Sequence, residues 1–554
     1  MLNYWLVAML FFIQAALFAP WMRRTRAVTP LDAIRLRFGP IVEQICVYTG
    51  FLGAFVWSGV FLLTLATFVS AVFGIGIVPI IVVLGIVILF YSVSGGSWSV
   101  QITDNLQSFM LIPMTIVMAV LALDQIGGIG GLLDGIRDAG LTADFAMIKS
   151  MDHTYSAGSV AKVKPMFYTM PWLAAMMFSQ FVAAANIRSS YRYLSIKTGN
   201  EARKAALLAG TLTLVGSFIW VVPVMVGRLK FGGLIEALDM KYPADGAYAV
   251  TAKQLLPPGM LGLVIVAMFS ATMSSMDSNL TGTAGLLVRN LYVPLMRALK
   301  KKPLDGKPLL RLTQTVNLGL ALWAIGAALI FYKFGQGGIF NMMVMILALI
   351  GIPTGMPFVV SLLMRRVPFW GPIVGMVFGF AASVFMTKIA FISPKSGFEW
   401  VFGRAPYYHD IVFVVGGFSL IPTVLTRLFW STASEAYRKR VDYFFKLIHT
   451  PVDVEKELGE SLDHSQLKTV GGLGMLLSSS LVPLVIYGFF KSDSALQKGC
   501  ALFVFLFVFV LCALMYYKGR KATDLATEAH AKHLEGAEPG DGMMDAQEQK
   551  PAAD

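Results

Sequence analysis

The sequence has few of the residues on which soluble enzymes and metalloproteins depend. Its 554 residues include three cysteines and six histidines, and only 14% are charged, against roughly 25% in soluble domains. The histidines are scattered and show no metal-ligand spacing. Cys46, Cys500 and Cys512 lie in or beside apolar segments, so we expect small core residues rather than disulfides. A soluble multidomain protein, a disulfide framework and a metal-ligating motif are therefore disfavoured.

Apolar residues are abundant, at 56% of the chain. A helix that spans a bilayer needs about 20 predominantly apolar residues. The sequence predicts an all-α polytopic membrane protein with about thirteen such helices, at residues 2–20, 42–72, 75–95, 105–127, 166–190, 205–227, 257–287, 312–332, 337–364, 368–391, 409–428, 469–490 and 497–517.

The formal charge of +13 follows membrane topology and does not indicate a nucleic-acid surface, because the basic residues lie in short loops between apolar segments. With the N-terminus outside, the inner connections carry roughly twice as many Lys and Arg residues as the outer ones, as the positive-inside rule requires. We therefore expect a multi-pass protein of the cell (inner) membrane with an outer N-terminus and a cytoplasmic C-terminus.

Four regions are expected along the chain. Residues 1–430 form a transporter-like core, and residues 431–468 a charged amphipathic segment at the cytoplasmic surface. Residues 469–518 hold two further spanning helices, and residues 519–554 are polar and poor in aromatics, which predicts a disordered tail. The longest outer loop, about 128–165, contains an amphipathic stretch around residues 132–136.

One predicted span carries polar groups at its centre. Ala271, Ser274, Ser275 and Ser278 fall at i, i+3, i+4 and i+7 of the segment 257–287 and share one helical face. Asp277 lies within the same run, and ionisable groups at mid-bilayer usually mark an ion or substrate path. Hydroxyl and carbonyl oxygens suit an alkali cation that must bind weakly and reversibly. Small residues that let two helices pack closely are the alternative.

Two other segments carry polar residues between or within spans. Asp104 follows Gly95-Gly96 on the inner side, where it could cap a helix that starts at Asn105 or lie near an ion path. The segment 166–190 contains Ser179, Gln180 and Asn186. Discontinuous helices of this kind form substrate sites in transporters, although such polar residues also bond neighbouring helices.

These residues resemble the motifs of the sodium:solute symporter family, in the family's order. Four stretches carry the resemblance, over roughly residues 4–430: Pro20…Thr29…Arg37-Phe38-Gly39; Tyr91…Gly95-Gly96…Thr103-Asp104…Gln107; Arg192-Tyr193-Leu194…Glu201-Ala202-Arg203; and Leu255-Leu256-Pro257…Gly262-Leu263 followed by Ala271…Ser274-Ser275.

The resemblance implies an inverted-repeat bundle of the leucine-transporter type that works by alternating access. It implies that Ala271 offers its carbonyl, and Ser274 and Ser275 their hydroxyls, to a sodium ion. It places Asp104, Asp277 and Ser278 at a candidate accessory cation site. No cofactor other than sodium as coupling ion is implied, and the partners are a small solute, sodium and the lipid bilayer, with no nucleic acid.

The sequence also departs from the family pattern. Family members have two helices ahead of the segment that matches residues 2–20, and the second of these supplies the remaining sodium ligands. We expect a shortened reading frame, with a fragment or a loss of transport as alternatives. Tyr4 stands where sugar carriers have Glu, Val344 where they have Gln, and Ile187 where many members have Gln, which disfavours a hexose.

The resulting hypothesis is sodium-coupled symport of a small organic solute, with Ser179, Gln180 and Asn186 near the solute. The alternative is a transporter-like protein that acts as a sensor or scaffold. A polytopic membrane enzyme ranks low, because no paired acids or histidines converge at one membrane face. A channel is a weaker variant of the transport hypothesis, and saturation of the flux would separate the two.

Overall fold

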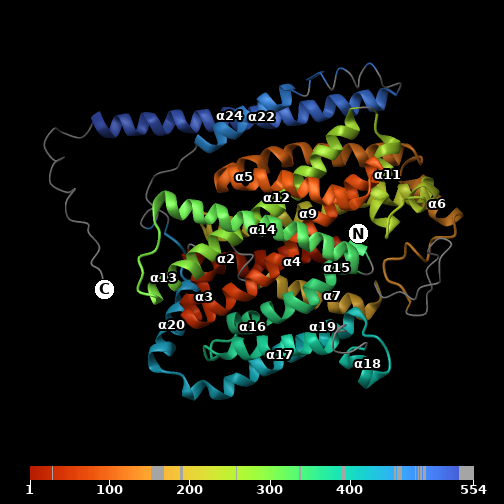
Figure 1. Cartoon of the computed structure of the whole chain (residues 1–554). Coiled ribbons are helices and arrows are strands. Elements are labelled where there is room, and N and C mark those ends of the chain that lie inside the picture. The colour runs from red at the N-terminus through yellow and green to blue at the C-terminus, as the bar shows by residue number, and fades with distance from the viewer. Residues whose placement is uncertain are drawn as a thin grey trace.

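The computed structural model describes the backbone of residues 1–27, 29–150, 168–186, 191–257, 259–335, 338–387, 395–453, 465–480 and 494–535, with short pieces between 457 and 490. Side chains are not described at 91–108, at 522–535 or at several single positions, which include 277. Within these ranges the chain is helical and contains no strand. Its long helices lie roughly side by side in one bundle (Figure 1).

The first half of the chain contributes an interrupted first span and three long helices. The first span consists of α1 (Leu2–Ile13), a π-helical turn η1 (Gln14–Phe18) and α2 (Ala19–Arg24). The short α3 (Pro30–Phe38) then turns sharply at Gly39, whose φ of 94° favours glycine. It leads into α4 (Pro40–Phe73), α5 (Ile77–Asp124) and the short α6 (Gly128–Asp138).

Helix α5 contains two of the predicted spans. Its 48 residues would measure about 72 Å if straight, more than twice the hydrocarbon thickness of about 30 Å. Ile77 lies beside Leu63 in one pocket wall, while Met118 shares a packed cluster with Phe68. Both ends of α5 therefore reach the same level of α4, and Ile77–Phe90 and Phe109–Asp124 act as separate spans.

The second half begins with α7 (Met170–Ala184) and the short α8 (Tyr191–Leu194), which are followed by the long α9 (Gly199–Lys230). A connection then runs through α10 (Gly232–Glu236), η3 (Pro243–Gly246) and α11 (Ala247–Leu255). The next span joins α12 (Met260–Leu287), the π-helical turn η4 (Val288–Tyr292) and α13 (Val293–Ala298), and α14 (Gly306–Phe334) returns across the bundle.

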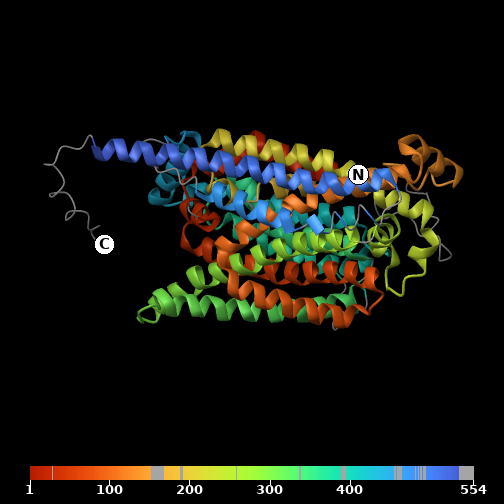
Figure 2. The same ribbon diagram turned by 90° about the horizontal axis from the view of Figure 1, so that it is seen from above.

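The remaining helices cover opposite sides of the bundle. One side has α15 (Gly338–Ile346), η5 (Leu347–Gly351), α16 (Ile352–Leu363), α17 (Gly371–Met386), α18 (Gly397–Phe402) and α19 (Tyr408–Leu425), then η6 (Thr426–Thr432) and α20 (Glu435–His449). On the other side, α22 (Ser465–Ser480) and α24 (Ala495–Glu535) pack together. Helix α24 projects beyond the bundle (Figures 1 and 2).

Twelve of the thirteen predicted spans coincide with apolar helices, which confirms the fold class. The remaining span, 469–490, overlaps α22, and most of its second half lies outside the described residues. Eight helices are long and apolar enough to span, or nine if the bent pair α5–α6 counts as one, and three shorter apolar helices add Ile77–Phe90, Met170–Ala184 and Gly371–Met386. All three cysteines are buried and form no disulfide, as expected for small core residues. In the amphipathic stretch of α6, Leu132 and Ile136 are buried.

Two details differ from the sequence prediction. Helix α24 continues to Glu535 and does not end near residue 518, because residues 519–535 are rich in Ala, Glu, Lys and Leu, which favour helix despite their polarity. No helix begins at Asn105, because α5 continues through this position. Asp104 itself lies outside the residues whose side chains are described.

Candidate functional site

The predicted cation-binding residues lie on α12, which begins after Gly259. This residue has φ 91° and ends the turn that follows Pro257. The helix then packs one face against α4, α5 and α14, through four buried side chains: Met273, Met276, Leu280 and Ala284. These residues recur at helical spacing, so they fix the rotation of α12 about its axis.

The serine-bearing face points the other way. Ala271, Ser274 and Ser278 are half-buried and Ser275 is exposed. A Cβ added to Gly282 or Gly285, further along the same face, would meet no atom within 4 Å. These oxygen-bearing groups are therefore reachable and are not plugged by a described neighbour.

This face does not point into lipid along its whole length. Seven residues before Ala271, Val264 lies on the same side of α12, and both Val264 and Ala267 are buried. Val264 belongs to a cluster with Met114 and Val117 of α5 and with Val504 of α24. The serines thus continue a face that is covered by protein in the first half of α12.

Two of the predicted ligands contact each other. The Ser275 hydroxyl donates to the Ala271 carbonyl at 3.3 Å, which brings together two oxygens of the proposed ion site. The neighbouring Thr272 hydroxyl donates to the Met268 carbonyl at 3.0 Å. Two turns beyond Ser274, the Thr281 hydroxyl is buried without a hydrogen-bond partner among the described residues, and sequence analysis did not single it out.

The accessory cation site has only one described member. Ser278 lies half-buried beside Asn279, whereas the side chains of Asp104 and Asp277 lie outside the described set. Asn279 has a structural contact, because its Nδ2 donates to the Ala54 carbonyl of α4 at 3.0 Å. This bond anchors the polar segment of α12 to α4.

The residues predicted to lie near the solute have separate environments on α7. The Ser179 hydroxyl is fully buried, donates to the Ala175 carbonyl at 2.9 Å and lies 3.2 Å from the Tyr408 hydroxyl of α19. Gln180 is also buried. Asn186 follows the end of α7 and is half-buried. Ser179 therefore serves the contact between α7 and α19, while Asn186 lies at the helix break.

A polar cluster at this break was missed by sequence analysis. Gln14, in the π-helical turn η1, donates from Nε2 to the Ala184 carbonyl at 3.2 Å and accepts from the Tyr193 hydroxyl at 2.7 Å. Gln14 is buried, and π-helical turns often occur at functional sites. The available signal was a single glutamine within an apolar span, but nothing in the sequence indicated its partners.

Ionisable groups also connect the two halves of the chain at the end of the bundle where α3 meets η4. The buried Glu43 carboxylate accepts from Asn290 Nδ2 at 2.9 Å and lies 3.6 Å from Arg35. Asp32 and Arg289 form a second pair at 3.6 Å. These contacts connect α3 and α4 with the turn that follows α12.

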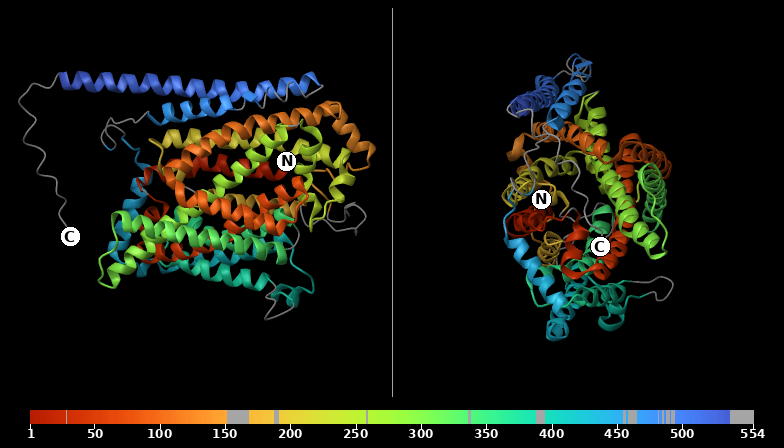
Figure 3. Two further views of the ribbon diagram at one scale, coloured as in Figure 1. Left: turned by 45° about the horizontal axis from the view of Figure 1, so that its top comes forward. Right: turned by 90° about the vertical axis from the view of Figure 1, so that its left-hand side faces the viewer.

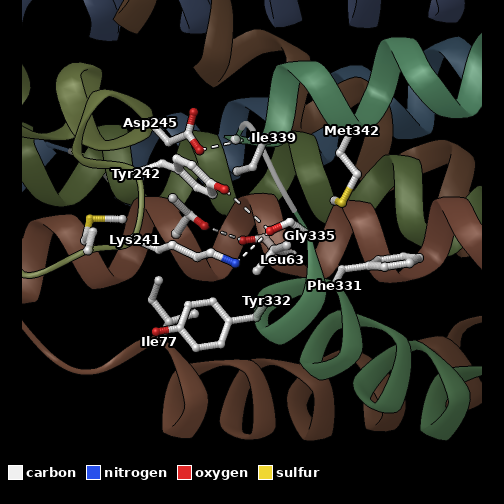
Figure 4. A pocket seen from close by; sticks show the side chains of 13 residues that line it. Leu63, Ile77, Lys241, Tyr242, Asp245, Phe331, Tyr332, Gly335, Ile339 and Met342 are labelled. Carbon is white, nitrogen blue, oxygen red and sulfur yellow. Dashed lines mark hydrogen bonds between the residues drawn. The ribbon is translucent and has the colours of Figure 1, made fainter. Parts of the chain in front are cut away.

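A pocket opens at the opposite end of the bundle, and Figure 4 shows the side chains that line it. Apolar residues line most of it, and Lys241 and Asp245 come from the connection between α9 and α12. Lys241 donates to the Gly335 carbonyl at 2.7 Å. One Asp245 carboxylate oxygen accepts from the backbone N–H of Ile339 at 3.2 Å, at the start of α15. Burial raises the pKa of Asp245, and this backbone bond opposes the rise.

The chain matches known proteins over most of its length. The model for the sodium:solute symporter family matches residues 2–379. Solute carrier family 5 member 4B of Mus musculus is 22% identical over 513 residues, which cover 85% of this chain and 75% of that protein. Sodium/glucose cotransporter 2 of Rattus norvegicus is 24% identical and sodium/glucose cotransporter 1 of Ovis aries 23% identical, with 66% and 70% of this chain covered. The match spans 58% and 61% of these two cotransporters.

A solved structure shares the fold. It is the substrate-bound outward-open state of a Na⁺-coupled sialic acid symporter, with a TM-score of 0.57 at 15% identity over 77% of this chain and 83% of that chain. At this identity the likeness concerns the fold, and it confirms the predicted inverted-repeat architecture of a transporter.

Proposed function

Because this chain belongs to the sodium:solute symporter family, we propose that it carries a small organic solute across the cell membrane together with sodium. The main support is the accessible oxygen-bearing face of α12, where Ser275 and the Ala271 carbonyl already lie together. Related proteins named as sodium/glucose cotransporters are consistent with this activity.

We assign the sodium half-site to Ala271, Ser274 and Ser275. One carbonyl and two hydroxyls are neutral oxygen donors, which replace part of the hydration shell of a monovalent cation and still allow release. When sodium binds, the Ser275 oxygen offers its free lone pairs to the ion, while its proton remains on the Ala271 carbonyl. The Thr281 hydroxyl lies on the same side of α12 and is a further candidate oxygen.

The solute is expected beside this half-site, near the break that follows α7. Backbone groups freed at a helix break can hydrogen-bond a polar solute at mid-depth. Gln180 and Asn186 are the side chains of this segment that we assign to the solute, whereas Ser179 contacts Tyr408. Ser278, with Asp104 and Asp277, is kept as the proposed accessory cation site.

The coupling step follows from charge and position. Sodium that enters with the solute moves down the membrane potential, which supplies about 2.3 kcal/mol per charge per 100 mV. Because Asn279 fixes α12 to α4, the half-site moves together with α4 when the bundle changes between its outward-open and inward-open states.

Uptake into proteoliposomes tests the proposal. A counterflow screen of small polar solutes identifies a substrate, and uptake is then compared in inward gradients of sodium and of potassium. We expect uptake only with sodium, and we expect Ser274→Ala with Ser275→Ala to weaken the apparent sodium affinity at least tenfold.

Thr272→Val is the matched control, because this hydroxyl bonds within its own helix; it should keep the sodium response. Uptake by the double variant with unchanged sodium dependence would contradict the site assignment. An absence of sodium-dependent uptake across the solute screen would favour a sensor or scaffold.

A further inference from the structure

An exposed corner lies where the chain turns from α19 into α20, at the end of the bundle that also holds α3 and α13 (Figures 1 and 3). We call it the η6 corner, and it comprises residues 363–370 and 425–440. Its two stretches are in contact, because a Cβ added to Gly371 would lie 2.6 Å from Val367 and 2.8 Å from Thr426. The rings of Trp370 and Phe429 are 5.9 Å apart.

The corner exposes large apolar side chains. Leu428 is 76% exposed, and four further apolar residues at the corner are also exposed: Leu363, Phe369, Leu425 and Phe429. Leu428 and Phe429 lie near the end of the candidate span Tyr408–Thr432, the part of a span that adjoins the headgroups. Exposed aliphatic and aromatic side chains at this level insert into the acyl boundary.

The same corner carries unneutralised cations. Its acid Glu435 is paired with Lys439 at 2.7 Å, and the next acid of α20, Asp442, is paired with Arg365. The described residues provide no carboxylate partner for the remaining exposed arginines of the corner, which are Arg366, Arg427, Arg438 and Arg440.

Local contacts hold one of these arginines in place. Arg438 donates to the Ser431 carbonyl at 2.7 Å, and its guanidinium carbon lies 6.0 Å from the centre of the Trp430 ring. Arg440 lies against the α3–α4 turn, since a Cβ on Gly39 would come within 2.8 Å of its guanidinium. The positive charge is therefore presented by a fixed framework rather than by a loose tail.

We propose that the η6 corner binds the headgroup of an anionic phospholipid. The phosphate accepts hydrogen bonds from Arg366 and Arg427, whose positions adjoin the contacting residues Val367 and Thr426, and the acyl chains lie along Leu425, Leu428 and Phe429. Guanidinium groups match phosphate oxygens in planar, bidentate geometry. Basic residues beside a spanning helix also favour anionic lipid by roughly fivefold each.

The test measures lipid retention by the purified full-length protein. Delipidated protein in neutral detergent is titrated with phosphatidylglycerol or with phosphatidylcholine, and bound lipid is counted by native mass spectrometry. We expect preferential retention of phosphatidylglycerol, and at least tenfold weaker binding after Arg366→Gln with Arg427→Gln. Neither side chain makes a described hydrogen bond that would be lost.

The matched control is Lys301→Gln with Lys302→Gln, which removes the same charge from the exposed loop between α13 and α14. It should retain phosphatidylglycerol as the parent does. Equal retention of both lipids, or an equal loss in the two double variants, would overturn the proposal. Displacement of the lipid by millimolar inorganic phosphate would also overturn it, because a free anion and not a lipid would then be the ligand.

Discussion

Gln14 bonds the last residue of a helix that lies 170 positions further along the chain. Its Nε2 donates 3.2 Å to the carbonyl of Ala184, where α7 ends. The last carbonyls of a helix have no partner within the helix. Gln14 supplies this partner for the Ala184 carbonyl. Its side-chain oxygen also accepts from the Tyr193 hydroxyl of α8, so a single side chain of the first span contacts both α7 and α8.

Replacing Gln14 with Leu should destabilise this junction. The variant leaves the Ala184 carbonyl and the Tyr193 hydroxyl buried without their partner, at a cost of about 1–3 kcal/mol. We expect a lower melting temperature in detergent, and a smaller rise in that temperature when solute is added. Tyr193→Phe removes only one of the two bonds and should cost about half as much. Equal melting temperatures for Gln14→Leu and the parent would show that the bond contributes nothing.

Asp245 should make stability depend on pH. Its pKa is raised in the folded protein because the carboxylate is partly buried. The folded state therefore holds the proton more tightly than the unfolded state, and stability declines as pH rises from about 4 through the folded pKa. Asp245→Asn keeps an acceptor for the Ile339 N–H and removes the charge, so its melting temperature should rise at neutral pH and vary less with pH.

Asp134→Asn is the control for this measurement, because Asp134 is exposed and pairs with Arg137 of the same helix. It should leave the pH profile unchanged. A steeper decline of stability with pH in Asp245→Asn than in the parent would contradict the assignment.

Loss of the contact between Glu43 and Asn290 should lower the stability of the protein. Asn290→Leu leaves the buried Glu43 carboxylate with only Arg35, 3.6 Å away. A buried charged acceptor that loses a donor costs about 1–3 kcal/mol or more. Glu43→Gln with Asn290→Leu together should be less harmful than the two single effects added. Additive melting-temperature changes in this double-mutant cycle would argue against a direct interaction.

Arg37 should prove to be a structural residue of the Arg37-Phe38-Gly39 motif. Its fully buried guanidinium donates to the Tyr437 hydroxyl at 2.6 Å and to the Arg365 carbonyl at 3.1 Å. Arg37→Lys cannot form both bonds from one fork, so we expect about 1–3 kcal/mol of destabilisation. Arg438→Lys, an exposed arginine one position from Tyr437, should cost less. Similar melting temperatures for both variants would contradict a special role for Arg37.

Local patterns in the sequence predicted the helices and the orientation of the serine face. Hydrophobic runs and the 3.6-residue period are properties of neighbouring residues, so they located α12 and its polar side. The buried partners of polar residues could not be predicted in this way. Gln14 and Ala184, Glu43 and Asn290, and Arg37 and Tyr437 are 170, 247 and 400 residues apart, and no local period connects them.

The motif Arg37-Phe38-Gly39 also shows that local sequence does not reveal contacts between distant residues. The sequence identified it as a family resemblance without a physical reason. The structure supplies two: Gly39 takes a φ of 94° at the α3–α4 corner, and Arg440 fills the space that a Cβ would need. The second reason depends on α20, about 400 positions later, and was not predictable from the motif.

Direct sodium binding tests the central claim. Radioactive sodium bound to the purified protein is measured at equilibrium, with potassium as competitor, for the parent, for Ser274→Ala with Ser275→Ala, and for Thr272→Val. We expect saturable binding that potassium does not displace, unchanged in Thr272→Val and at least tenfold weaker in the serine double variant. Saturable sodium binding of equal affinity in all three proteins would contradict the site on α12.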